Sequence, residues 1–141
     1  MYKKVFIDAN IFIDTNDKNR VAYEESLKII HYLIENGIAI YTSCDLITTI
    51  YYILAKNNKE NALASIEQIS TFTNIIEFSN KEVKETCKLM REDKKYKDLE
   101  DTMQYLLAKK ENCELILSND KGFYASDIEV MGSKEFSSRL G

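Results

Sequence analysis

The sequence predicts an α/β protein with a mainly parallel central sheet of four to five strands. Short apolar runs rich in β-branched residues alternate along the chain with longer segments in which apolar residues recur at helical spacing. Two of these runs are followed directly by a polar residue: Val5–Ile7 by Asp8, and Leu115–Leu117 by Ser118. Strands that alternate with helices favour a parallel sheet, in which the helices serve as crossover connections.

Composition indicates an ordinary globular protein, and we expect one domain over residues 1–141. Hydrophobic residues make up 45% of the chain and charged residues 30%, enough to bury a core. No apolar run approaches the roughly 18 residues that cross a bilayer, and no signal peptide is apparent, so we expect a cytoplasmic protein without a membrane segment. The net charge of −4 disfavours a broad basic surface for nucleic acid but leaves room for a local metal-assisted site.

The cysteines and the single histidine carry no recognisable motif. Cys44, Cys87 and Cys113 are odd in number and lack metal-ligand spacing, so we interpret them as reduced packing residues. His31 lies in a predicted helix without a partner motif, and we interpret it as an ordinary surface or core residue.

The first half of the chain predicts three strands joined by helices. After the strand 5–7, residues 15–20 form a loop, and a helix runs from about Tyr23 until Gly37 ends it. A second strand covers 38–41, with Thr42 and Ser43 as N-cap candidates for the next helix. A break at 56–59 precedes a third helix that ends near residue 71, and residues 75–76 form a third strand. The buried faces of these helices are predicted to contain Tyr23, Leu27, Ile30 and Ile34, then Leu46, Ile47, Ile50, Tyr51 and Leu54, then Leu63, Ile66 and Ile69.

The second half begins with a capping box, in which Ser79 precedes Glu82 by three residues. The helix that follows has Val83, Cys87 and Met90 at helical spacing. A charge-dense connection over 91–97 leads to a helix that starts near Asp98 and carries Met103, Leu106 and Leu107 inward. Residues 115–117 form a fourth strand, 128–130 a possible edge strand, and 133–140 a last short helix.

Acidic residues are predicted to gather at the carboxyl ends of the strands. Asp8 and Asp120 follow apolar runs that we expect to be neighbouring parallel strands, and ligands of open α/β sheets bind beyond such strand ends. Asp98 and Asp101 are three residues apart at a helix start and share one face. The alternative for this pair is that both complement the helix dipole and cap free N–H groups.

Convergence of these carboxylates predicts a divalent metal ion. Carboxylates within about 4–6 Å of one another either take up protons or bind a cation. With oxygen ligands and no histidine or cysteine set, Mg²⁺ or Mn²⁺ fits better than zinc, and phosphate-ester chemistry is the usual purpose of such sites.

Three segments resemble the motifs of the PIN domain, a nuclease fold common among the toxins of bacterial VapBC toxin–antitoxin pairs. These segments are FIDANIFID, DLEDTMQYLLA and LILSNDKGF, and TSCDLITTIYYILAK is similar to the second helix of a PIN subgroup. The resemblance implies a three-layer α/β/α fold. It also implies a Mg²⁺- or Mn²⁺-dependent ribonuclease that has a small antitoxin as its partner and forms a homodimer.

The resemblance also implies roles for single residues. Asp8, Asp101 and Asp120 would be the catalytic metal-binding aspartates and Asp98 an accessory ligand. Asn10 and Ser118 fall at positions where the family often has polar residues that assist the site.

The sequence departs from the family at two positions. Thr49 stands where PIN nucleases commonly have a glutamate in the second helix. Asp45, one turn earlier, either substitutes for it in part or merely caps its helix. Gly122 stands where many relatives have an acidic residue.

Three functional hypotheses follow from these residues. The first is a metal-dependent ribonuclease, in which Lys94, Lys95 and Lys97 bind RNA phosphates or, alternatively, form a solvated loop. The second is a degenerate PIN domain that binds RNA or a partner protein without cleaving, because Thr49 replaces the glutamate. The third is an aspartyl-phosphate enzyme or a receiver-like domain, in which Asp8 is the phosphorylated nucleophile, although the segment Asp8-Ala9-Asn10 lacks the second aspartate of the phosphatase pattern.

Overall fold

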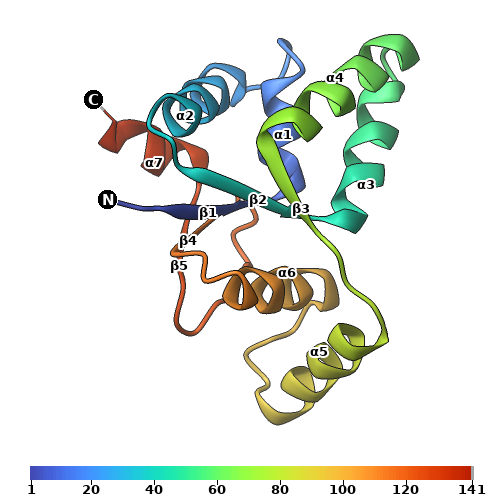
Figure 1. Ribbon diagram of the computed structural model, residues 1–141, viewed down its shortest axis with the longest axis vertical. Coiled ribbons are helices and arrows are strands. Elements are labelled where there is room, and N and C mark those ends of the chain that lie inside the picture. Colours follow the sequence, from blue (N-terminus) through green and yellow to red (C-terminus); the bar gives the residue numbers. More distant parts are fainter. Residues whose placement is uncertain (141) are drawn as a thin grey trace.

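The computed structural model describes residues 1–140 and has a five-stranded sheet between two layers of helices (Figure 1). The strands are β1 (Lys4–Ile7), β2 (Ala39–Ser43), β3 (Thr73–Ile76), β4 (Leu115–Leu117) and β5 (Glu129–Met131). The helices are α1 (Ala9–Thr15), α2 (Tyr23–Glu35), α3 (Cys44–Ala55), α4 (Lys59–Phe72), α5 (Asn80–Glu92), α6 (Leu99–Lys110) and α7 (Ser133–Arg139).

The sheet has the order β3-β2-β1-β4-β5, and every neighbouring pair is parallel. The predicted parallel sheet is therefore confirmed. From β1 the chain builds outward through β2 to β3, then returns to the other side of β1 to form β4 and β5. The strand order thus reverses between β1 and β4, and such a reversal opens a crevice at the carboxyl ends of the two strands. Ile7 pairs with Leu117, so these two ends lie level with each other.

Helices cover both faces of the sheet, as predicted for a three-layer α/β/α fold. Helices α1, α2, α3, α4 and α7 lie on one side and α5 and α6 on the other (Figure 1). Val5, Phe6 and Ile7 of the central strand are fully buried, as are all three residues of β4. Burial on both faces explains why these strands appear in the sequence as continuous apolar runs rather than as alternating ones.

Helix α1 was not predicted from the sequence. Its residues Ile11, Phe12 and Ile13 are all buried, and the helix packs against α2 and α3. With only seven residues, α1 is too short to show a helical period in the sequence. Asp8 is its N-cap, and its carboxylate accepts a hydrogen bond from the Ala9 backbone N–H at 2.7 Å. The strand-end carboxylate is therefore also a helix start.

The boundaries of the other predicted elements need small corrections. Strand β2 continues to Ser43, so Thr42 belongs to the strand and only Ser43 is an N-cap. Strand β5 is displaced by one residue from the predicted 128–130. The capping box of α5 is confirmed: the Glu82 carboxylate accepts a hydrogen bond from the Ser79 N–H at 2.9 Å.

Several residues that were predicted to face inward are exposed. Ile34, Leu63 and Val83 are exposed, and Cys87 is exposed rather than packed. In α2 the fully buried face is formed by Ser26, Ile29, Ile30 and Leu33, and in α5 the buried residue is Thr86. Apolar spacing predicted these helices correctly, but the face that packs depends on which neighbouring helix covers it.

The structure also places the cysteines and the histidine. All three cysteines are free, with Cys113 buried and Cys44 half-buried. His31 lies on the surface. Among residues 1–140, no helix combines the length and the apolarity needed to cross a lipid bilayer.

Candidate active site

Asp8 lies at the carboxyl end of the central strand, where it is only 6% exposed. Its backbone N–H extends the ladder by donating to the Leu117 carbonyl at 3.0 Å. Its carboxylate accepts hydrogen bonds from the Ala9 N–H and from the Ser118 hydroxyl, at 2.7 and 2.8 Å. Burial raises the pKa of Asp8, and these two donors partly oppose the increase. The fold therefore holds the Asp8 carboxylate in a position largely shielded from water, where desolvation disfavours its charged form.

Asp120 comes from the loop after β4, next to Asp8. The Ser118 hydroxyl joins the two residues, because it donates to Asp8 and also accepts from the Asp120 backbone N–H at 3.1 Å. The Asp120 carboxylate accepts from the Gly122 N–H at 2.9 Å. Asp8 and Asp120 thus project from neighbouring parallel strands, as predicted, and Ser118 contacts both. The assisting role of Ser118 stays a prediction.

Asp101 lies in the first turn of α6 and is 8% exposed. Burial raises its pKa to about 8, together with a carboxyl–carboxyl hydrogen bond to Asp120 and the charges of Asp120, Asp98 and Asp8. Asp101, at the start of α6, therefore lies close to Asp8 and Asp120, which follow the ends of β1 and β4.

Asp98 has a structural task in this arrangement. It is the N-cap of α6, and its carboxylate accepts a hydrogen bond from the Asp101 backbone N–H at 2.9 Å. Capping accounts for its position at the helix start. Its predicted role as an accessory metal ligand stays a prediction.

Sequence reasoning missed Glu100. Although this residue is exposed as a whole, partial desolvation and the nearby negative charges of Asp8, Asp45, Asp98 and Asp120 raise the pKa of its carboxyl group. A signal was present in the sequence, since Glu100 directly precedes Asp101. The i and i+3 spacing that relates Asp98 to Asp101 does not include this residue.

Asp45 lies at the border of the acidic group. It occupies the first turn of α3, where its carboxylate accepts a hydrogen bond from the Ser43 hydroxyl, and burial raises its pKa. Its charge acts on Glu100, so Asp45 lies near the acidic residues, while Ser43 is the N-cap of α3. Thr49 lies one turn later on α3 and is half-buried.

The other predicted site residues lie farther out. Asn10 is exposed on the first turn of α1. Lys97 lines a narrow crevice together with Asp98 and Asp101, whose wall also contains Tyr96 and Tyr124. Lys94 and Lys95 lie in the turn before this crevice and are exposed, and they are not among the residues that line it.

The chemistry of the donors suits a hard divalent cation. The side chains that converge carry carboxylate and hydroxyl oxygens, which Mg²⁺ and Mn²⁺ prefer. Within residues 1–140, no three acidic, cysteine or histidine side chains already have the arrangement needed to hold one ion.

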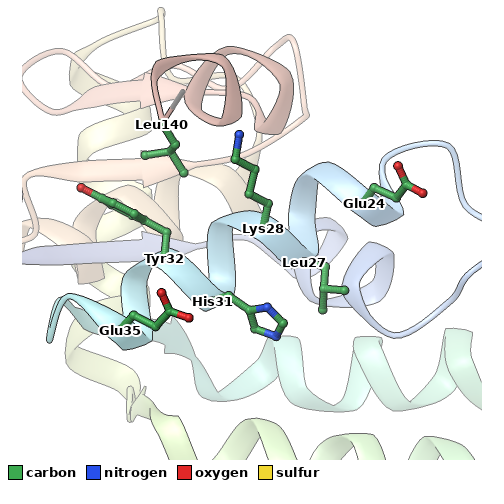
Figure 2. Close-up of a pocket in the computed structure, with 7 residues that line it drawn as sticks. All are labelled: Glu24, Leu27, Lys28, His31, Tyr32, Glu35 and Leu140. Atoms are coloured by element: carbon green, nitrogen blue, oxygen red, sulfur yellow. The ribbon is translucent and has the colours of Figure 1, made fainter.

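A second hollow on the surface is unrelated to this chemistry. It lies along α2, where Lys28 and Tyr32 extend toward Leu140 while Leu27 and His31 point to the other side of the helix (Figure 2). These side chains do not converge on one point, and the acidic residues of the crevice are not among them. The carboxyl groups with raised pKa values, those of Asp8, Asp45, Glu100 and Asp101, gather instead near the β1–β4 reversal.

Comparisons with known proteins agree with this architecture. A family model described as the PIN domain matches residues 5–128. Ribonuclease VapC1 of Aquifex aeolicus (strain VF5) is 49% identical over 137 residues, which covers 97% of this chain and 95% of that protein.

Two solved structures share the fold at low identity. VapBC2 from Rickettsia felis, bound to a DNA fragment from its promoter, matches with a TM-score of 0.68 at 20% identity, covering 92% of this chain and 98% of that one. DNA-bound VapBC from Salmonella typhimurium gives the same TM-score of 0.68 and the same coverage at 15% identity.

Proposed function

Because the chain belongs to the PIN-domain family, we propose that it is a metal-dependent ribonuclease that hydrolyses RNA phosphodiesters as the toxin of a toxin–antitoxin pair. The observation that carries this proposal is the convergence of Asp8, Asp101 and Asp120 at the β1–β4 reversal. The 49% identity to a protein named Ribonuclease VapC1, over almost the whole of both chains, supports the same activity.

Each residue of the site has a separate role in this proposal. Asp8, Asp101 and Asp120 would hold Mg²⁺ or Mn²⁺, with Asp98, Asp45 and Glu100 adding negative charge nearby. A bound divalent ion lowers the pKa of a coordinated water and offsets charge on the phosphoryl oxygens. Ser118 and the Ala9 N–H orient the Asp8 carboxylate, and Asp101 must release its proton before it can act as a ligand. Lys97 lies on the crevice wall, where it can bind an RNA phosphate.

The experiment compares cleavage of RNA by the wild type and by Asp8→Asn with Mg²⁺ or Mn²⁺. We expect the variant to lose activity, because it keeps the shape of Asp8 but removes the charge. Asp127→Asn is a useful control, since Asp127 pairs with Lys109 at 2.6 Å, at the opposite end of α6 from Asp101. Equal rates for wild type and Asp8→Asn, or activity that persists in a chelator, would contradict the proposal.

A degenerate domain that binds RNA or a protein without cleaving is the second candidate, motivated by Thr49. Thr49→Glu separates the two. A gain in cleavage or in Mn²⁺ affinity would indicate an active site weakened by the missing glutamate. Absence of metal binding in both forms would favour the binding module.

A small antitoxin is the proposed protein partner, supported by the likeness to VapBC structures. The first helices offer apolar side chains to it. A groove between α1, α2 and α4 is lined by Phe12, Leu27, Ile30, Ile34, Ile69 and Phe72. We expect Ile34→Asp to abolish co-purification with the product of a neighbouring short reading frame, and Tyr52→Asp, on α3, to leave it intact. Co-purification of both variants would place the partner elsewhere.

We also propose that the protein acts in the cytoplasm, where its RNA substrate is present, and that it forms a homodimer as the family resemblance implies. Light scattering of the purified chain measures the dimer directly, and a monomer at micromolar concentration would contradict this part of the proposal.

A further inference from the structure

Gln104 has the least satisfied side chain near the acidic residues. It lies on α6, is 1% exposed, and neither its amide nitrogen nor its amide oxygen has a hydrogen-bond partner. Buried polar groups are almost always paired, so a side chain with both its donor and its acceptor unpaired requires an explanation. An apolar side chain of the same length would fill this position without that cost.

The position of Gln104 supplies the explanation. It lies three residues after Asp101 in α6, so the two side chains share one face of the helix. Its amide lies close enough to Asp8 to lower the pKa of that carboxyl group, although the two groups do not have the full geometry of a hydrogen bond. The unpaired amide is therefore aimed into the group formed by Asp8, Asp101 and Asp120.

An amide has the chemistry that this position needs. It is neutral, so it adds no charge to a group already crowded with carboxylates, and it carries both a donor and an acceptor. Asp8 already accepts from the Ala9 N–H and the Ser118 hydroxyl, and a third donor would fix the remaining freedom of its carboxylate. Mg²⁺ usually keeps several of its waters, which need acceptors beyond the ligands themselves.

We propose that Gln104 is a positioning residue of the metal site: its amide N–H donates to the Asp8 carboxylate and its amide oxygen accepts from a water held by the cation. The inference rests on the proposed function, since it requires that a divalent ion binds at Asp8, Asp101 and Asp120. Residues that orient metal ligands commonly change metal affinity by 10–100-fold when they are replaced.

Gln104→Met tests the proposal, because methionine keeps the length of the side chain and removes the amide. Two quantities are measured for the purified full-length chain: Mn²⁺ affinity by calorimetry, and the urea midpoint in a chelator. We expect Mn²⁺ binding to weaken about 10-fold or more, and the metal-free midpoint to stay the same or rise.

Ser26→Ala is the matched control. The Ser26 hydroxyl is also buried and unpaired, but it lies on α2, on the other side of the sheet from α6. Its removal should leave Mn²⁺ affinity unchanged. Gln104→Leu is a second variant for the case in which methionine disturbs folding.

The outcomes separate the inference from the proposed function. Mn²⁺ affinity within twofold of wild type in both Gln104 variants overturns the inference and leaves the proposed function standing. A lower metal-free midpoint with unchanged affinity assigns Gln104 to core packing and also overturns the inference. Absence of Mn²⁺ binding in the wild type overturns both.

Discussion

The Ser118 hydroxyl donates a hydrogen bond of 2.8 Å to the Asp8 carboxylate, across 110 residues of sequence. The same oxygen accepts from the Asp120 N–H. One hydroxyl group thus ties together the ends of two parallel strands and two of the three aspartates of the site. This bond adds a side-chain link to the backbone ladder between β1 and β4, which ends with the Asp8 N–H donating to the Leu117 carbonyl.

Removing this hydroxyl should weaken both the fold and the metal site. In Ser118→Ala the buried Asp8 carboxylate loses a donor, so we expect the free energy of unfolding to fall by about 1–3 kcal/mol. Mn²⁺ affinity should fall about 10-fold. Urea denaturation and calorimetry measure the two effects. Ser138→Ala, which removes an exposed hydroxyl from α7, should change neither, and an unchanged Mn²⁺ affinity in Ser118→Ala would contradict the role given to this bond.

The stability of the metal-free protein should depend on pH with a definite sign. The pKa of Asp101 is raised to about 8 in the folded state, from an ordinary value of 3.8. Between these values the folded chain binds more protons than the unfolded chain, so stability falls as pH rises from about 4 to about 8 and levels off above. The raised pKa values of Asp8 and Glu100 act in the same direction.

Asp101→Asn should therefore reduce this slope and raise the melting temperature at pH 8. Thermal denaturation in a chelator between pH 5 and 8.5 measures it, with Glu67→Gln on the exposed side of α4 as the control. In the wild type with Mn²⁺, stability should instead rise with pH, because the metal must displace the proton of Asp101. A flat profile in the chelator would show that Asp101 is ionised without metal.

Lys97 and Lys94 should contribute unequally to RNA binding. Lys97 lines the crevice that contains Asp101, whereas Lys94 lies in the preceding turn and is not among the lining residues. We expect Lys97→Ala to raise KM for a short RNA severalfold while kcat changes less, and Lys94→Ala to have a smaller effect. Steady-state cleavage at low ionic strength measures both. Equal effects would indicate a general attraction by the loop's charge rather than a defined phosphate contact.

Gly132 should not tolerate a side chain. A Cβ atom there would lie 2.9 Å from Asn119 Oδ1, which is held by hydrogen bonds from the Ser133 N–H and hydroxyl at 2.8 and 3.2 Å. We expect Gly132→Ala to lower the free energy of unfolding by about 1–3 kcal/mol. In an Asn119→Ala background the same substitution should cost much less, and full additivity of the two changes would contradict the clash.

The sequence was most informative where an element is buried on both faces or ends in a cap. Strands β1 and β4 appear as unbroken apolar runs, and Asp8 and Asp120 follow them, so the location of the acidic residues could be predicted from the pattern alone. The start of α6 could be predicted from Asp98 for the same reason. These features depend on local chemistry that does not change with the rest of the fold.

Features that depend on a neighbouring element could not be predicted in this way. The short helix α1 could not be predicted from the sequence, because its apolar residues are buried where it packs against α2 and α3. The exposed positions of Ile34 and Leu63 follow from which helices lie beside α2 and α4. Gln104 appears in the sequence as an ordinary polar residue of α6. Only its burial beside Asp8 sets it apart.

The position of β1 in the middle of the sheet has a consequence for synthesis of the chain. On one side β1 pairs with β2, which follows soon after it, but on the other it pairs with residues 115–117. A nascent chain therefore exposes one edge of its central strand until β4 has left the ribosome, and such an open edge can pair with other chains. Asp120 follows β4 by three residues, so the acidic site is completed only with that last central pairing. A truncated product ending before residue 115 would thus carry an aggregation hazard and no nuclease site.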